Sequence, residues 1–286
     1  MSFCRFVQDA NVTMLGVIPS LVRAWRNTDA IAGLDWSAIE TFSSTGECSD
    51  ADDMLYLMSQ ANYRPVIEYC GGTEIGGGYI TSTVVQPNRP SCFSTPALGI
   101  DLVLLNEDQP VDEGEVFLIG PSIGLSQTLL NADHEAVYFA GTPQPKGLPR
   151  LRRHGDQLTC LPDGSYRASG RADDAMNLGG IKISAVELER CLNQLPGIIE
   201  TAAVSTSSGP STLVIFAVLD TPPDGSQSKD PQEAPAELKS TMQAAISQNL
   251  NPLFRISQVI PVDSLPRTAS NKIMRRLLRT RTPDSQ

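Results

Sequence analysis

The sequence predicts an α/β protein made of two parts, on the strength of three observations. In about the first 80 residues, apolar runs alternate with helical segments, the pattern of a parallel sheet covered by helices on both faces. From residue 82 to 160 the helical signal fades, and short β-type runs are separated by Asp, Asn, Gly and Pro turns. After residue 171, helices and strands mix in a small α+β unit. We therefore expect one domain over residues 1–171 and a second over 172–286.

The first part begins with a strand over 12–18 (VTMLGVI), and Pro19 then opens a helix, since proline is favoured in the first helical turn. A second strand near 38–42 leads through the turn SSTGE into a helix over 50–61 with acidic residues in its first turn. A third strand over 65–70 (PVIEYC) ends in the glycine-rich GGTEIGGG. Ligands of parallel sheets bind beyond the carboxyl ends of the strands, so this last segment is a candidate site.

The middle section, with strands over 100–105 and 114–119, is expected to be antiparallel or barrel-like. In the last part, Ser184 and Glu187 have the spacing of a capping box, and an amphipathic helix follows until Pro196-Gly197. The remaining expected elements are strands over 201–206 and 211–220, a helix over 236–250, a strand over 255–262 and a final helix over 272–279.

Composition argues against several classes of protein. The formal net charge is −10 and the pI is about 4.7, which disfavours a nucleic-acid partner. No run approaches the roughly 20 apolar residues of a membrane span, and the start of the chain lacks a signal-peptide pattern. The six cysteines form no C-x-x-C pair, so we expect reduced and mostly buried thiols rather than zinc ligands or a disulfide framework.

The carboxyl end of the chain is basic although the whole is acidic. Six Lys or Arg residues follow Pro266 against one acid, Asp284, which leaves a net charge of +5. Such a cluster is either a solvated terminal helix or a segment that meets an anion.

Three segments carry residues suited to phosphate chemistry. Beyond the third strand, glycines let a phosphate approach the backbone, and Thr73 and Glu74 supply a hydroxyl and a carboxylate for phosphate and Mg²⁺. RHGD, GRADD and GGIK come next, with Asp156 in the first of them, and Lys272 lies on a polar loop before the final helix. Glycine turns, Asp turn caps and a solvated lysine are the simpler interpretations of these segments.

In this order, the segments resemble the AMP-forming acyl-CoA synthetase and adenylation superfamily. The matching stretches are YCGGTEIGG, GEVFLIG, RHGD, GRADDAMNLGGIKISAVELE and PRTASNKIMRR. Their sequences are most similar to those of plant peroxisomal acyl-activating enzymes. The resemblance implies the C-terminal part of a large adenylation domain, with a parallel sheet, helices and a small barrel-like section, followed by a mobile small domain. It also implies ATP or AMP, Mg²⁺ and CoA as cofactors, and a small carboxylic acid as substrate.

The resemblance assigns roles residue by residue. Thr73 would contact the α-phosphate, Glu74 would hold Mg²⁺, and Lys272 would be the catalytic lysine of adenylation. Asp173 would be the hinge between two orientations of the small domain. The resemblance also places Gly46 and Glu47 at the adenine, and Tyr69, Gly71 and Gly72 at the nucleotide. Asp156 would bind the ribose, with Arg171 beside it, and Gly180 would lie near the CoA tunnel. Lys182 stands where many relatives carry an arginine.

Departures from the family pattern shape a second expectation. The Ser/Thr/Gly-rich phosphate loop should precede YCGGTE, and residues 1–68 contain none; the similar GTPQPKG over 141–147 comes too late and is interpreted as coincidental. His154 and Asn271 replace the family's usual Thr and Gly. We therefore expect a C-terminal portion that is weakly active or inactive alone and pairs with an N-terminal portion, or else a non-catalytic regulatory remnant.

Three further expectations concern substrate, location and a competing enzyme class. Cys70, Gly71 and Gly72 stand where short-chain relatives carry a bulky Trp, which favours acids longer or bulkier than acetate. The ending TPDSQ is not an SKL-type signal, but the subgroup that the sequence resembles is peroxisomal, and the expected location is therefore cytoplasmic or peroxisomal. Finally, GPSIG over 120–124 matches a nucleophile elbow, so a serine hydrolase using Ser122, with Asp133, His134 or His154 as partners, is the alternative.

Overall fold

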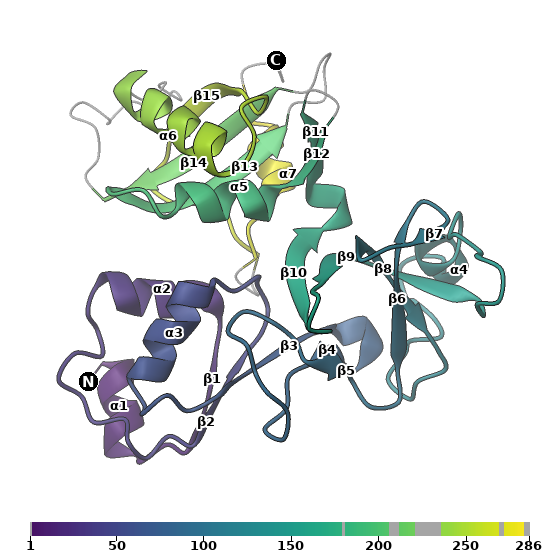
Figure 1. Ribbon diagram of the computed structural model, residues 1–286, viewed down its shortest axis with the longest axis horizontal. Coiled ribbons are helices and arrows are strands. Elements are labelled where there is room, and N and C mark those ends of the chain that lie inside the picture. The colour runs from purple at the N-terminus through teal and green to yellow at the C-terminus, as the bar shows by residue number, and fades with distance from the viewer. Residues whose placement is uncertain (1, 179–180, 206–211, 221–235, 269–271, 283–286) are drawn as a thin grey trace. The chain divides into compact units, whose positions relative to one another are not determined.

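The computed structural model describes residues 2–178, 181–205, 212–220, 236–268 and 272–282 (Figure 1). The chain divides into two compact units, Met1–Ser169 and Gly170–Gln286. Within the described residues, no helix is both long enough and apolar enough to cross a membrane.

The first unit begins with an α/β layer. Its sheet has the order β1-β2-β3-β4-β5, in which β1, β2 and β3 are parallel and β4 and β5 are antiparallel to their neighbours. The elements are α1 (Phe3–Asp9), β1 (Met14–Val17), α2 (Pro19–Asn27), β2 (Thr41–Ser44), α3 (Ala51–Ser59), β3 (Val66–Gly72), β4 (Gly77–Thr81) and β5 (Thr95–Pro96). The expected strand–helix alternation is confirmed.

Helices α2 and α3 bury apolar side chains at helical spacing. Val22 and Trp25 of α2, and Met54 and Leu57 of α3, join one core cluster with the parallel strands. Asp53 of α3 is buried among them, and its two carboxylate oxygens accept from Arg23 and Arg26 of α2, each at 3.0 Å. A buried carboxylate needs such partners, because its charge is costly away from water.

A second sheet completes the first unit. Its order is β10-β9-β8-β6-β7, and β8 pairs antiparallel with both β6 and β9, so the antiparallel section predicted from the sequence is confirmed. Its elements are β6 (Asp101–Asn106), β7 (Gln109–Pro110), β8 (Glu113–Ile119), α4 (His134–Tyr138), β9 (Leu151–Cys160) and β10 (Tyr166–Arg171). A separate core cluster packs residues of β4 with residues of β6, β8 and β9.

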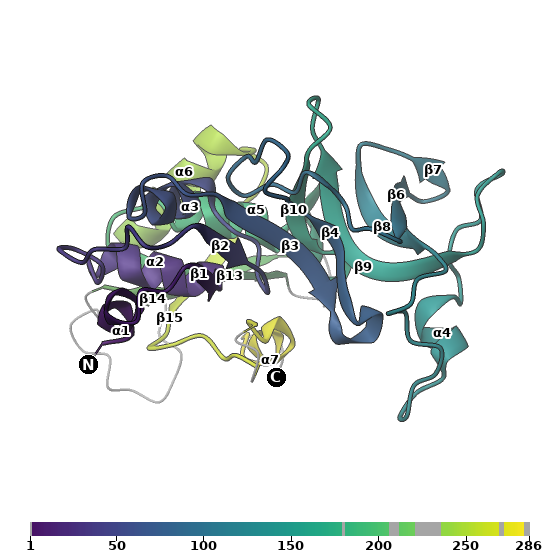
Figure 2. The same cartoon turned by 90° about the horizontal axis from the view of Figure 1, so that it is seen from below.

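Strand β3 connects the parallel layer to an antiparallel hairpin (Figure 2). Residues 66–68 pair parallel with β2, whereas residues 69–72 pair antiparallel with β4, and the register shifts between Cys70 and Gly71. At this bulge, a Cβ added to Gly71 would lie 2.0 Å from the carbonyl oxygen of Gly77. Only glycine allows the two backbones to approach so closely.

The second unit is an α+β fold. Strands β11 (Ala175–Leu178) and β12 (Ile181–Ser184) form an antiparallel hairpin, while β14 (Leu213–Leu219) pairs antiparallel with β13 (Ile198–Ser205) and parallel with β15 (Ile256–Pro261). The helical elements are the short 3-10 turn η2 (Ala172–Asp174), α5 (Ala185–Leu192), α6 (Ala236–Asn249) and α7 (Arg275–Arg279). The hydroxyl of Ser184 accepts from the Glu187 amide, 3.4 Å away, which confirms the predicted N-cap of α5.

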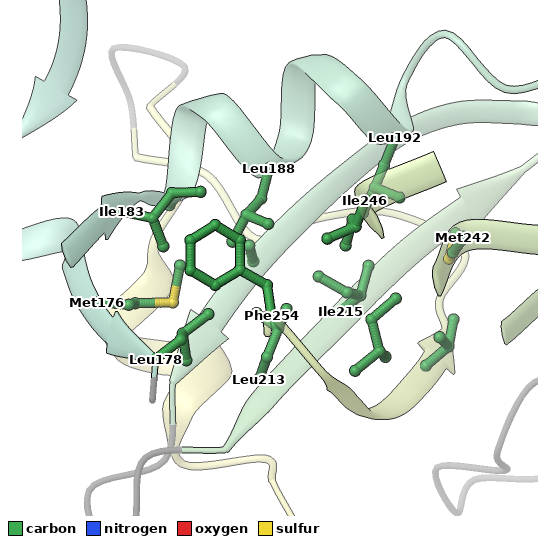
Figure 3. Close-up of a cluster of buried hydrophobic side chains, with 14 of the residues drawn as sticks. Met176, Leu178, Ile183, Leu188, Leu192, Leu213, Ile215, Met242, Ile246 and Phe254 are labelled. Carbon is green, nitrogen blue, oxygen red and sulfur yellow. The ribbon is translucent and has the colours of Figure 1, made fainter. Parts of the chain in front are cut away.

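The described residues of the second unit form two buried apolar clusters, one of which is drawn in Figure 3. Leu188 and Leu192 of α5 pack with Ile215 of β14 and Ile246 of α6, and all four are fully buried. Met176, Leu178 and Ile183 of the hairpin join the same cluster. The unit therefore has a core of its own, independent of the first.

Ion pairs fix the basic C-terminal helix to the second unit. The Nη2 atom of Arg275 lies 2.9 and 2.8 Å from the two carboxylate oxygens of Glu189, and its Nη1 lies 3.0 Å from Asp174. Glu189 is buried and also accepts from the Ala203 amide at 2.9 Å. Arg279 reaches Asp174 at 3.4 Å, and Arg267 pairs with Glu200. Half of the six basic side chains near the chain end thus serve the unit's own acids.

Replacing Gly71 by alanine should destabilise the first unit by about 1–3 kcal/mol, because the new methyl group would overlap the Gly77 carbonyl. Gly77→Ala is the matched control, since a Cβ at Gly77 meets no atom within 4 Å. Urea denaturation measures both free energies of unfolding. Equal stability of the two variants would contradict the close approach.

Replacing Arg275 by methionine should destabilise the second unit by about 3–5 kcal/mol, because Glu189 would then be buried without its cation. Burial raises the pKa of Glu189, so the folded state already favours the protonated acid more than the unfolded state does. Losing the arginine strengthens that preference, and the stability deficit should therefore be largest near neutral pH and shrink on acidification. The exposed Arg276→Met is the control; a deficit independent of pH in urea titrations would argue against the pairing.

Candidate functional site

The candidate site lies in the first unit, where the parallel strands end. Val17 pairs with Ser44, and Ser44 pairs with Glu68, so the segments that follow β1, β2 and β3 leave the sheet along one edge. These segments are the start of α2, residues 45–47, and residues 69–74, which lie beyond the parallel-paired part of β3. The positions that the resemblance assigned to adenine and to the α-phosphate therefore leave the sheet at the same edge, as expected for a parallel sheet.

The segment after β2 is held against helix α2. Gly46 has a φ of +93°, a conformation that favours glycine and turns the chain. The next residue, Glu47, accepts a hydrogen bond from the Ser20 amide at 2.9 Å. Ser20 is in the first turn of α2, where free amides and the helix dipole favour a carboxylate. Glu47 thus has a structural partner at the position where the resemblance implied adenine.

One of the two glycines before Thr73 is required by backbone geometry. The Gly77 carbonyl occupies the space that a side chain at Gly71 would need, whereas a Cβ at Gly72 would meet only the end of the Glu74 side chain, 2.4 Å away. The sequence reasoning attributed both glycines to an open acyl pocket, but the bulge accounts for Gly71 without one. Tyr69 is 38% exposed and pairs with Thr81 of β4.

Thr73 and Glu74 lie in η1 (Thr73–Ile75), a short 3-10 turn that presents both side chains. Thr73 is exposed, and the Glu74 side chain is 34% exposed. The Glu74 backbone carbonyl accepts from the Ser126 amide at 2.9 Å and from buried Arg152 at 3.3 Å. Ser126 and Arg152 therefore hold the Glu74 backbone in place, while the Glu74 carboxylate remains accessible to a ligand.

Asp156 of β9 is the meeting point of the site. Its Oδ2 atom accepts from the Tyr79 hydroxyl at 3.0 Å and from the Cys70 thiol at 3.2 Å, and it lies 3.1 Å from His154 Nε2. The other ring nitrogen of His154 is 3.9 Å from a Glu74 oxygen. The structure thus brings together the two carboxylates that the resemblance assigned to ribose and to magnesium, with one nearly buried histidine between them.

The donor set suits magnesium shared with a nucleotide better than a closed metal cage. Among the described residues, no group of three or more His, Cys, Asp or Glu side chains could hold a metal. Thr73 and Glu74 offer one hydroxyl and one accessible carboxylate. Mg²⁺ accepts such oxygen ligands one or two at a time, and phosphates and water complete its shell. The residues present therefore fit an ion that arrives with a nucleotide.

The other predicted site residues belong to the region from Gly170 onward. Arg171 is exposed at the end of β10. Lys272 is also exposed, and its backbone closes a loop: its amide donates to the Thr268 hydroxyl at 3.1 Å and its carbonyl accepts from the Thr268 amide at 2.9 Å. The backbone of Asp173 is in η2 and that of Lys182 is in β12, opposite Asn177, whereas Gly180 lies outside the described residues.

The serine hydrolase alternative is wrong, because the backbone after β8 does not form a nucleophile elbow. A nucleophile elbow needs a helix directly after the serine. Here β8 is followed by Ser122 and a turn at Ile123 and Gly124, and the next helix, α4, begins at His134. His134 instead contacts the Ser126 carbonyl at 2.8 Å, and Asp133 caps α4.

The structure corrects one expectation about side chains and adds two residues that the sequence did not indicate. All six cysteines are free, as predicted, but only Cys4 and Cys92 are buried; the other four are partly exposed. Sequence reasoning also missed Tyr79 and Arg152. Tyr79 sits just beyond the glycine run and contacts a residue 77 positions away, and no local motif indicates such a contact.

Comparison with known proteins finds one matching family and several similar sequences. Residues 187–272 match the family described as AMP-binding enzyme C-terminal domain. The chain is 48% identical to probable acyl-activating enzyme 17, peroxisomal, of Arabidopsis thaliana, and 46% identical to hexanoyl-CoA synthase of Cannabis sativa. Each comparison covers 97% of this chain and 39% of the relative, so the chain spans about two fifths of the length of these relatives.

Solved structures share the fold. An anthranilate CoA ligase in complex with anthranoyl-AMP is similar with a TM-score of 0.78 and 22% identity, over 97% of this chain and 51% of that one. Acetoacetyl-CoA synthetase of Streptomyces lividans gives a TM-score of 0.78 and 22% identity, over 99% of this chain and 43% of that one. Residues 187–272 therefore belong to the AMP-binding enzyme C-terminal domain family, and the chain as a whole is similar to the C-terminal part of plant acyl-activating enzymes.

Proposed function

We propose that the chain contributes the nucleotide-binding edge and the mobile small domain of an AMP-forming acyl-CoA synthetase. In the first step, a carboxylate oxygen attacks the α-phosphorus of ATP, and pyrophosphate leaves. In the second step, the CoA thiolate attacks the acyl carbon, and AMP leaves. The convergence of Glu74, His154 and Asp156 beyond the parallel strands is the observation that carries the proposal.

In the nucleotide site, Asp156 accepts the ribose hydroxyls and Glu74 shares Mg²⁺ with the phosphates. Thr73 donates its exposed hydroxyl to the α-phosphate, and Gly46 and Glu47 border the adenine. Bound Mg²⁺ neutralises charge on the phosphates, which favours departure of pyrophosphate. The turn η1 supports this arrangement, because its backbone is anchored through Ser126 and Arg152.

The second unit supplies the cation and the pivot. Lys272 stabilises the negative charge that develops on the α-phosphate during adenylation. Arg171 assists at the ribose, Lys182 and Gly180 serve the CoA step, and Asp173 is the hinge. Asp174 is bound to Arg275 and Arg279, which fixes it to the second unit, so rotation takes place at or before Asp173.

We propose a medium-chain acid as the substrate and a peroxisomal location. The support is the names of relatives: the Cannabis enzyme is called hexanoyl-CoA synthase, and Arabidopsis acyl-activating enzymes 17 and 18 are called peroxisomal. The glycine at 71 adds no support to the substrate assignment, because the close approach to the Gly77 carbonyl explains it.

We propose that full activity requires an assembly of this chain with a second portion. That portion corresponds to the part of the relatives that this chain does not match. Residues 1–68 contain no phosphate-loop sequence. Strand β1 is an edge of its sheet, and nearby Phe3, Phe6 and Met14 are 52%, 53% and 60% exposed. An apolar surface beside an open strand edge favours pairing with further chain. A non-catalytic regulatory role is the second candidate, and the same two features favour it.

The test is exchange of labelled pyrophosphate into ATP with hexanoate. The chain is assayed alone and after mixing with the part of the Cannabis enzyme that precedes the matched region. We expect little exchange by the chain alone and clear exchange by the mixture. Lys272→Ala should reduce exchange by about 100-fold or more, because one electrostatic partner of the transition state is lost.

Lys146→Ala is the matched control, since Lys146 is an exposed lysine in the loop resembling a phosphate loop. It should leave exchange unchanged. Strong exchange by the chain alone would contradict the need for a partner portion. Equal loss in both lysine variants would contradict the role of Lys272, and no exchange in any mixture would favour the regulatory alternative.

A further inference from the structure

The Asp156 carboxylate is held by side chains from three strands. Cys70 comes from β3, Tyr79 from β4 and His154 from β9, and all three meet the Oδ2 atom within 3.2 Å. We infer that Cys70, Tyr79 and His154 are positioning residues that orient Asp156 and so set the preference of the site for a nucleotide with both ribose hydroxyls. This inference rests on the proposed function, because it assigns supporting residues to the ribose carboxylate.

The packing around the carboxylate leaves these donors little freedom. Tyr79 is fully buried, and its ring packs against the His154 imidazole with the ring centroids 4.4 Å apart. The His154 side chain is 4% exposed, whereas the Asp156 side chain is 14% exposed. Asp156 is therefore enclosed by its donors but retains an accessible face, as a ligand-binding carboxylate requires.

The direction of each hydrogen bond is fixed by protonation. Burial raises the pKa of the Tyr79 hydroxyl well above its ordinary value, with Cys70 and the negative charge of Asp156 contributing. Burial and Asp156 likewise raise the pKa of the Cys70 thiol. Both groups therefore remain protonated at neutral pH and act as donors, while the ionised carboxylate accepts.

Such an arrangement prepares the carboxylate before a ligand binds. A carboxylate bound by several donors on one oxygen has lost most of its rotational freedom, so its orientation need not be fixed at the moment of binding. Two adjacent hydroxyls can donate to it together only if its plane is correctly oriented. Removing a donor should therefore weaken binding of a diol and leave binding of a nucleotide without the diol unchanged.

The bulge at Gly71 links this cluster to the fold. Its register shift comes directly after Cys70, whose thiol meets Asp156, 86 residues further along the chain. Sequence comparison alone suggests only that His154 replaces a threonine. The contacts give the histidine a definite task, which is to support Asp156 through Nε2 from two positions earlier on the same strand.

The test is calorimetric titration of the 286-residue chain with AMP and with 2′,3′-dideoxy-AMP. The variants are Tyr79→Phe, Cys70→Ala and Cys70→Ser. Tyr79→Phe should weaken AMP binding by about tenfold, and dideoxy-AMP binding should not change. Cys70→Ala should act in the same direction, and Cys70→Ser, which keeps a donor, should restore the preference for AMP.

Two controls separate positioning from folding and from the proposed function. Tyr56→Phe removes a hydroxyl that donates to the Trp25 carbonyl in the same unit, and it should leave both affinities unchanged. Unchanged dideoxy-AMP binding shows in each variant that the site is folded. Asp156→Asn removes the charged acceptor itself and should abolish the preference for AMP.

Each outcome decides the inference. If Asp156→Asn abolishes the preference but Tyr79→Phe and Cys70→Ala keep it, the positioning role is overturned and the ribose role of Asp156 stands. If all these variants lose the preference and Cys70→Ser regains it, the inference is supported. If the unmodified chain does not prefer AMP over dideoxy-AMP, the ribose role fails and the inference falls with it.

Discussion

The close approach of Gly71 to the Gly77 carbonyl is the constraint on which the site depends. Strand β3 pairs with β2 up to Glu68 and with β4 from Tyr69 onward, and the close approach at the bulge lets the pairing with β4 continue through Gly71 and Gly72. The same bend directs Thr73 and Glu74 into a short turn and brings Cys70 to Asp156. A larger residue at position 71 would separate the hairpin strands, and the groups that meet at Asp156 would no longer converge. The glycine is thus required by backbone geometry, and the neighbouring Cys70, Thr73 and Glu74 depend on it.

Local patterns in the sequence predicted most of the elements but few of the contacts between them. The alternation of strands and helices and the Ser184 cap depend on neighbouring residues, and periodicity and capping chemistry are sufficient to find them. The cluster at Asp156 depends on residues separated by 77 and 86 positions, which no local pattern relates. The final helix was predicted over 272–279 but begins at Arg275, because the backbone of Lys272 is used to close a loop with Thr268. The prediction of a nucleophile elbow was wrong for a related reason. The GPSIG sequence matches the motif, but the helix that an elbow needs does not follow Ser122 directly.

The charge pattern also needed the structure for its interpretation. A net charge of +5 at the chain end suggested an anion partner, yet Arg267, Arg275 and Arg279 neutralise acids of the second unit. Buried Glu189 and its arginine stabilise the position of the terminal helix, and the loop bearing Lys272 starts from that helix. The basic segment is therefore partly a structural device, and Lys272 is exposed at its start. The two units each have an apolar core of their own, as the proposed rotation of the second unit would require.

A crystal structure of the chain with AMP is the most direct test of a nucleotide site built around Asp156. We predict nucleotide density at the carboxyl edge of β1–β3, with both ribose hydroxyls in hydrogen-bonding distance of the Asp156 carboxylate and the phosphate near Thr73. Density for AMP elsewhere, such as on the exposed Lys272, Arg276 and Arg281 of the second unit, with none beside Asp156, would contradict the account.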